Sequence, residues 1–308
     1  MQTAATPAGD DTTVLAGVEL GGTKCICILG TGPDDVRERI ELPTQTPAET
    51  LAGIAAVLAC WDYAALGIGS FGPLDLDPAS TTYGAITNTP KPGWAGTPLL
   101  GLAGDHPVAI DTDVNGAALA EGLWGGAQGL TSWAYITVGT GIGVGSIVSG
   151  QPIRGLGHSE AGHLRVSRVP GDAFPGTCPF HGDCVEGLAN GPSIEARANM
   201  PGRDIPHDHP AWAFAADALA ILCHGLVFTS LPERILMGGG VAMGQPQMLP
   251  MIRKRLVESL NGYSAATMIA DRMDDYLVHP TLGANAGPLG TLALAKQALG
   301  LSPARSAK

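Results

Sequence analysis

Three metal-binding residues fall within seven positions near the middle of the chain, at Cys178, His181 and Cys184. A proline and a glycine separate them and favour turns, so the three side chains can point toward one centre. Tetrahedral Zn²⁺ takes four nitrogen or sulfur ligands, and the best fourth candidate is His163. The alternative is a loop with scattered thiols, but so dense a group is rare in a chain with six cysteines and eight histidines. The spacing therefore predicts a structural zinc site formed by these four residues.

Two glutamates lie within the same stretch, which runs from His158 to Glu186. The zinc ion needs neither Glu160 nor Glu186, because four protein ligands complete its coordination. Their carboxylates are therefore expected to bind another ligand.

The composition favours a small molecule as that ligand. With 308 residues and 45% apolar residues, the chain can form two α/β lobes or one large α/β unit. A net charge of −11 argues against nucleic acid or an anionic membrane as the main partner. No apolar run approaches the roughly 18 residues of a membrane span, and the N-terminus lacks a signal-peptide pattern. We expect a soluble, cytoplasmic protein.

Glycine-rich turns join adjacent predicted strands at two places. VLAGVEL and CICILG flank Gly21-Gly22-Thr23-Lys24, while WAYITV and the strand after it flank Gly139-Thr140-Gly141. Glycines let backbone amides approach an anion closely, and the threonine and lysine side chains add a donor and a charge. Ordinary glycine hairpin turns are common. The repetition nevertheless predicts a duplicated lobe that binds nucleotide phosphates at both turns, and neither turn fits a Walker A loop or a dinucleotide fingerprint.

Other segments lie where α/β sheets place ligands. Gly72 occupies a sharp turn after the predicted strand 65–70, and Gly238-Gly239-Gly240 end another strand, where a flat ring could lie against the backbone. The loop 87–94 carries Lys91 and Trp94 and is either a linker or a lip over a polar ligand.

Asp113 lies where a predicted strand, 108–111, gives way to a helix of small residues. A carboxylate at such a junction can accept a proton from a substrate hydroxyl. Aspartate is also a common helix N-cap, so the sequence leaves both roles open.

Together these motifs resemble the ROK family of sugar kinases, and within it the bacterial fructokinase branch. VELGGTK resembles the first phosphate loop, with Glu19 where most members have aspartate, and TVGTGIGVG resembles the second. Asp111-Thr112-Asp113-Val114-Asn115 resembles the family box that contains the general base and a sugar-binding residue, here Asp113 and Thr112. Glu160-Ala-Gly-His163 and the ending Cys184-Val-Glu186 resemble the motifs that bind zinc and sugar.

The resemblance implies a two-lobed actin/hexokinase-like (ribonuclease H-like) α/β ATPase fold with a zinc-binding loop. The smaller lobe is expected at 13–112, joined by a returning helix at 285–300. The larger lobe is expected at 113–284, with a zinc-binding insertion at 158–186. Because the first strand is expected within about fifteen residues of Met1, we do not expect the N-terminal DNA-binding domain of the family's repressors.

The implied activity is that of a fructokinase, which uses ATP and Mg²⁺ to make fructose 6-phosphate, with structural zinc and Asp113 as the base. A glucokinase, mannokinase or N-acetylhexosamine kinase would keep the same motifs, and a non-catalytic sugar sensor is the alternative outside enzymes. We expect a homodimer. Sugar binding is assigned to Gly72, Thr112, Asp113, Glu160, His163 and Glu186; phosphate binding to Gly21, Gly22, Thr23, Lys24, Gly139, Thr140, Gly141, Gly238, Gly239 and Gly240; and magnesium to Glu19.

Overall fold

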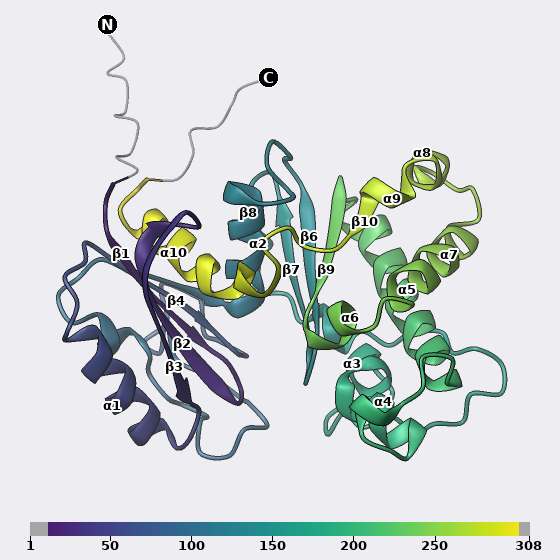
Figure 1. Cartoon of the computed structure of the whole chain (residues 1–308), viewed down its shortest axis with the longest axis horizontal. Helices are drawn as coiled ribbons and strands as arrows, with labels where there is room; N and C mark the ends of the chain where they lie inside the picture. Colours follow the sequence, from purple (N-terminus) through teal and green to yellow (C-terminus); the bar gives the residue numbers. More distant parts are fainter. Residues whose placement is uncertain (1–11, 302–308) are drawn as a thin grey trace, which may run out of the picture. The chain divides into compact units, whose positions relative to one another are not determined.

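The computed structural model describes residues 12–301, which divide into two compact units (Figure 1). Unit 1 comprises the described residues within Met1–Trp124 and Asn285–Lys308, and unit 2 comprises Gly125–Ala284. The last helix of the chain therefore belongs to the same unit as the first strands.

Unit 1 is an α/β unit with a mixed sheet in the order β3-β2-β1-β4-β5. Its elements are β1 (Leu15–Leu20), β2 (Lys24–Gly32), β3 (Asp35–Pro43), α1 (Pro47–Leu58), β4 (Leu66–Ser70), the 3₁₀ helix η1 (Leu100–Ala103), β5 (Val108–Thr112), α2 (Asp113–Trp124) and α10 (Ala286–Ala298).

The two faces of this sheet bury different kinds of residue. Val18 and Ile68, paired across β1 and β4, pack in one apolar cluster with Ile54 of α1. The next residues in the alternation, Gly17 and Gly67, face Thr291 of α10 on the opposite side. The helix can approach the sheet this closely because neither glycine has a side chain.

We predict that Gly67→Ala destabilises the protein by at least the 1–3 kcal/mol that is typical of overpacking. An added Cβ would lie 1.8 Å from the Thr291 carbonyl oxygen, and backbone cannot move aside as a flexible side chain can. Gly53→Ala on helix α1 is the control, since its Cβ would lie 3.6 Å from the nearest atom, on Leu42. Denaturant unfolding should show a lower free energy of unfolding for Gly67→Ala but not for Gly53→Ala. Equal stabilities of the two variants would contradict the close packing.

Unit 2 is a second α/β unit with a sheet in the order β10-β9-β6-β7-β8. Its elements are β6 (Trp133–Val138), β7 (Ile142–Val148), β8 (Gln151–Pro152), η2 (Ala161–His163), α3 (Val185–Ala189), α4 (Gly191–Ala198), η3 (Gly202–Asp204), α5 (Pro210–Thr229), β9 (Arg234–Gly238), α6 (Gly240–Gly244), α7 (Met248–Leu260), α8 (Ala266–Asp271), α9 (Met273–Tyr276) and β10 (Leu277–Val278), with η4 (Gly283–Asn285) at the boundary.

The two sheets have the same connectivity. In unit 1 the hairpin β1–β2 is antiparallel and β1 pairs in parallel with β4. In unit 2 the hairpin β6–β7 is antiparallel and β6 pairs in parallel with β9. Each sheet thus begins with a hairpin whose turn is one of the two glycine-rich segments. The repeated pattern in the sequence correctly predicted this duplicated α/β fold.

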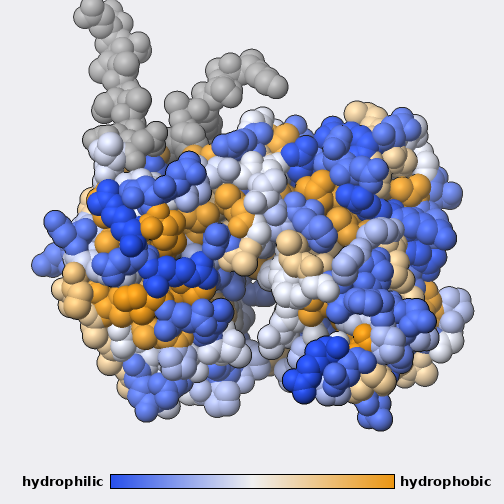
Figure 2. Space-filling view, viewed as in Figure 1, coloured by the Kyte–Doolittle hydropathy of each residue, from blue (hydrophilic) through white to orange (hydrophobic). Residues whose placement is uncertain are grey.

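Helix α5 corrects one expectation. At 20 residues it is long and apolar enough to cross a membrane by length and composition, although no such segment was expected. However, 61% of its apolar window is buried within the structure. Its buried residues, such as Leu219 and Leu222, join a cluster with Ile136 of β6 and Ile252 of α7. Hydrophilic residues cover much of unit 2 on the face drawn in Figure 2. Helix α5 therefore serves as the core helix of unit 2.

Candidate active site and metal centre

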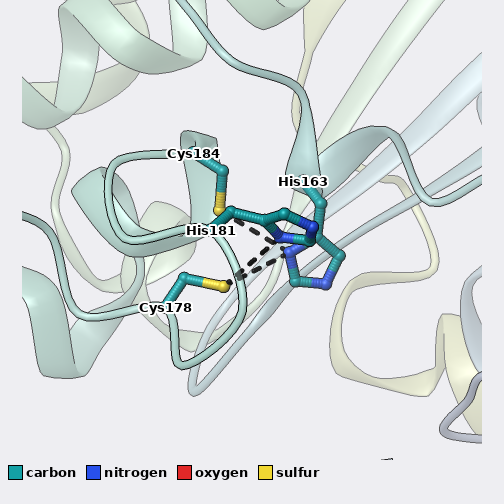
Figure 3. A group of neighbouring side chains, drawn as sticks. All are labelled: His163, Cys178, His181 and Cys184. Atoms are coloured by element: carbon teal, nitrogen blue, oxygen red, sulfur yellow. Dashed lines mark hydrogen bonds between the residues drawn. The ribbon is translucent and has the colours of Figure 1, made fainter. Parts of the chain in front are cut away.

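The four predicted zinc ligands converge in unit 2 (Figure 3). Their ligand atoms all lie within 4.8 Å of one another. Cys178 Sγ lies 3.7 Å from His163 Nδ1 and 3.6 Å from His181 Nδ1, and Cys184 Sγ lies 3.6 Å from His163 Nδ1. A tetrahedron with bonds of about 2.0–2.3 Å has edges of about 3.3–3.8 Å. The cluster therefore fits a tetrahedral ion.

The donor set also fits zinc. Both cysteines are buried, and burial raises the pKa of the Cys184 thiol to about 11. A bound cation would favour the thiolate that burial disfavours. Two thiolates with two imidazoles form the tetrahedral sulfur and nitrogen set typical of Zn²⁺.

A tight turn brings the first ligands together. The backbones of Cys178 and Gly182 exchange two hydrogen bonds, with N···O distances of 3.2 and 2.9 Å. Gly182 has a φ of +64°, a conformation that favours glycine. This turn places Cys178 and His181 on the same side, as the sequence predicted.

A buried ion pair anchors the chain before the turn, and sequence reasoning missed it. Asp172 accepts hydrogen bonds of 2.6 and 3.1 Å from Arg197, whose guanidinium lies 4.4 Å from the Phe174 ring centre and 4.5 Å from that of Phe214. Burial alone would raise the pKa of Asp172, but the hydrogen bonds from Arg197 and Arg168 outweigh it and lower the pKa to about 2. Helix α4 and the zinc-binding stretch are thereby joined.

Cys184 links the metal centre to Glu186. It is the N-cap of α3, and its sulfur accepts a hydrogen bond from the Gly187 amide. Glu186, in the first turn of α3, accepts a 3.0 Å hydrogen bond from the Ile142 amide through Oε2. Ile142 directly follows the second glycine turn, so a metal ligand and this turn are connected through one short helix.

Two more hydrogen bonds hold the second glycine turn. Asn190 Nδ2 donates to the Thr140 carbonyl at 2.9 Å, and the Gly191 amide donates to the Gly139 carbonyl at 2.8 Å. With the Glu186 contact, the segment from α3 to α4 supports the turn at three points. Sequence motifs identified Glu186 but gave no signal for Asn190.

The triple-glycine segment lies beside the same turn. A Cβ on Gly239 would lie 2.4 Å from the carbonyl oxygen of Val138, the last residue before the turn, and Gly239 has a φ of +88°. Gly238 ends β9 and Gly240 begins α6. Unit 2 thus gathers both of its predicted nucleotide-binding segments at the ends of β6 and β9.

Glu160 lies close to the metal ligand His163. The His163 amide donates to the Glu160 carbonyl at 2.9 Å, and His158 Nδ1 lies 3.4 Å from Glu160 Oε1. The Glu160 side chain is 44% exposed. Its carboxylate is therefore accessible to a ligand at a point fixed by a metal-binding residue.

In unit 1, Thr112 rather than Asp113 caps helix α2. Thr112 Oγ1 accepts the Asn115 amide at 3.2 Å, and Asp111 Oδ1 accepts Asn115 Nδ2 at 2.8 Å. Asp113 begins the helix, and its Oδ1 accepts the adjacent Val114 amide at 2.9 Å. Thr112, and not Asp113, is therefore the N-cap residue of α2.

Two carboxylates in unit 1 have raised pKa values. Burial raises the pKa of Asp113 to about 6. Burial and then the charge of Asp113 raise the pKa of Glu19 to about 7, against the opposing charges of Arg39 and Lys24. Mutually repelling carboxylates favour a proton or a cation between them. They are also oxygen ligands of the kind that Mg²⁺ prefers.

The first glycine turn is held by Thr44, the residue that directly follows β3. Thr44 donates its hydroxyl to the Gly21 carbonyl at 2.7 Å and its amide to the Thr23 carbonyl at 2.9 Å. Lys24 forms a 2.9 Å ion pair with Glu41. Gly72 follows β4 and is joined to Pro73 by a cis peptide bond.

Comparison with known proteins shows the family to which the chain belongs. The ROK family model matches residues 15–298. The chain belongs to the ROK family. It is 44% identical to a "Putative fructokinase" of Bacillus subtilis (strain 168), over 93% of this chain and 96% of that protein, and 41% identical to a "Fructokinase" of Pediococcus pentosaceus, over 93% and 99%. A ROK family glucokinase from Streptomyces griseus, solved in complex with glucose and AMPPNP, has a TM-score of 0.73 and 25% identity, covering 92% of this chain and 99% of that one.

The ROK resemblance and the α/β fold it implied are thus confirmed, whereas the lobe bounds and the zinc-binding insertion stay predictions. For the loop 87–94, the structure shows the role of Trp94. Trp94 is fully buried, and its Nε1 donates to the Gln45 carbonyl at 3.1 Å. It is a core anchor rather than a lip over a ligand. The apolar character of tryptophan was the available signal, but the prolines around it favoured an exposed loop.

Proposed function

We propose that this ROK protein is an ATP-dependent fructokinase that phosphorylates the 6-hydroxyl of D-fructose. The proposal rests most on Asp113, a carboxylate with a raised pKa at the carboxyl end of β5 that the helix does not use as its cap. Fructokinases 41–44% identical over most of the chain support the choice of sugar.

Asp113 acts as the general base. The sugar oxygen forms a bond to the γ-phosphorus of ATP while the bond from that phosphorus to the β,γ-bridging oxygen breaks. The hydroxyl proton passes to the Asp113 carboxylate, and ADP leaves with the electron pair. A pKa of about 6 leaves the base mostly ionised at neutral pH yet able to hold the proton.

Positioning and charge neutralisation supply most of the remaining rate enhancement in phosphoryl transfer. The amides of Gly22 and Gly141 and the hydroxyls of Thr23 and Thr140 bind phosphate oxygens. The amides of Gly21 and Gly139, which the sequence also assigned to phosphate, instead close their turns by donating to the Lys24 and Gly141 carbonyls at 3.0 and 2.9 Å. Glu19 would hold the Mg²⁺ that accompanies ATP, and the ion would supply neutralisation of phosphate charge when bound. The glycines at 238–240 complete the nucleotide contacts, and Lys24 orients the first turn through its ion pair with Glu41.

The sugar hydroxyls bind to Glu160, His163 and Glu186, with Gly72 and Thr112 as further contacts. Polar groups fixed in position to hydrogen-bond a substrate hydroxyl reject analogues that lack it. A zinc ion bound here would be structural, because two cysteines and two histidines would complete its coordination. We further propose a cytoplasmic homodimer that binds sugar and ATP, with no nucleic-acid or membrane partner.

A substrate panel tests the activity. ADP release from MgATP should be fastest with D-fructose among fructose, mannose, glucose and N-acetylhexosamines, and phosphate should appear on O6 by NMR. Faster turnover of glucose or mannose would reassign the chain to a sister kinase. No ADP release with any sugar would favour a non-catalytic sugar sensor.

A further inference from the structure

A second lysine, Lys91, lies at the first glycine turn. Its Nζ donates a 2.6 Å hydrogen bond to the carbonyl oxygen of Gly22, 69 residues earlier in the chain. Gly22 is exposed, in the middle of the turn between β1 and β2. The Lys91 ammonium therefore lies at the segment to which we assign the ATP phosphates.

Lys24, the lysine within the turn itself, is directed to another partner. Its ammonium forms an ion pair with Glu41 on β3, with a 2.9 Å separation. By contrast, the charge of Lys91 acts on Cys25, the residue that follows the turn. Burial raises the pKa of the Cys25 thiol, while the hydrogen bond with Thr44 and the charge of Lys91 oppose that rise. Geometry thus favours Lys91 over Lys24 as the cation at this turn.

The loop that carries Lys91 is held in place. The Lys91 carbonyl accepts a 3.3 Å hydrogen bond from the Trp94 amide, and the buried Trp94 ring contacts Phe71 edge-on at 5.3 Å. Prolines at 90 and 92 restrict the backbone on both sides of Lys91. A charged group held this way loses less entropy on binding than one on a flexible loop.

We infer that Lys91 binds the terminal phosphate of ATP and neutralises charge that develops on it during transfer. An ammonium has three N–H donors, and the Gly22 contact uses one, so Lys91 can bridge the turn and a phosphate oxygen. A positive group fixed before the reaction is the arrangement that stabilises phosphoryl transfer most effectively. The inference rests on the proposed kinase function and assigns that site a cation that the sequence motifs do not include.

The test compares Lys91→Met with Lys91→Arg and with Lys254→Met, which removes an exposed lysine from α7. Lys91→Met should lower kcat/KM for ATP roughly 10- to 100-fold, less than the about 10²–10³-fold lost with a fully enclosed donor. Lys91→Arg should recover part of the rate, and Lys254→Met should match wild type. In calorimetry, Lys91→Met should weaken binding of a non-hydrolysable ATP analogue more than binding of ADP.

Two results would overturn the inference. If Lys91→Met had wild-type kinetics, Lys91 would only connect its loop to the glycine turn through the Gly22 hydrogen bond. Equal losses of affinity for the ATP analogue and for ADP, with altered Trp94 fluorescence, would mean that Lys91 acts through the shape of the turn. If the wild-type protein phosphorylates no sugar, the proposed function fails, and the two binding constants still decide whether Lys91 contacts the terminal phosphate.

Discussion

Asp113→Asn is expected to lower kcat by about 10²- to 10⁴-fold, the range for loss of a general base. Asparagine has nearly the same shape and can still accept the Val114 amide, so the start of α2 should persist. Affinities for fructose and ATP should change little, because the amide can hydrogen-bond to the sugar hydroxyl but cannot take its proton. Steady-state kinetics with equilibrium binding of both substrates will separate these effects.

The pH dependence provides an independent check of the same role. A base with a pKa of about 6 must be ionised, so wild-type kcat/KM for fructose should fall as pH drops below about 6 and level off above it. Asp113→Asn should lack this acid limb. Asp105→Asn, in the exposed turn before β5, is the matched control and should retain both rate and limb. If Asp113→Asn turned over within tenfold of wild type, another group would have to be the base.

Local patterns predicted the parts of this protein that local geometry determines. Glycine turns between apolar strands produced both hairpins, and the spacing of Cys178, His181 and Cys184 identified the turn that brings them together. Each of these depends on a few consecutive residues, whose backbone preferences and hydrophobic alternation are visible in the sequence.

Contacts between distant segments could not be predicted in this way. The Lys91–Gly22 hydrogen bond and the Asp172–Arg197 ion pair each join residues that no shared motif relates. The short helices α6, α8 and α9 were missed because helices of four to six residues are too brief for a helical period to show. The apolar character of helix α5 was underestimated because Asp217 and His224 interrupt its apolar run, yet its overall composition remains apolar.

Cys178→Ser is expected to abolish zinc binding and to unfold the stretch from His158 to Glu186. Serine replaces a thiolate with a neutral hydroxyl, a poor ligand for Zn²⁺, and structural zinc is worth about 10–16 kcal/mol where it drives folding outright. The Asp172–Arg197 pair still anchors part of the stretch. The free energy of unfolding of unit 2 should therefore fall by only a fraction of that value. Metal analysis should show zinc loss, and limited proteolysis should show new cleavage within 158–186.

The same substitution should also abolish catalysis, because the metal centre and the second glycine turn share a support. Loss of zinc frees Cys184, the N-cap of α3, and with it the Glu186 carboxylate that holds the Ile142 amide. Cys60→Ser is the control: its thiol is exposed and donates only to the Ala56 carbonyl, so zinc content, melting temperature and kcat should stay at wild-type values. Chelation of wild-type zinc should reproduce the Cys178→Ser phenotype, and re-addition should reverse it in wild type alone. An active Cys178→Ser protein with a full zinc complement would remove Cys178 from the ligand set.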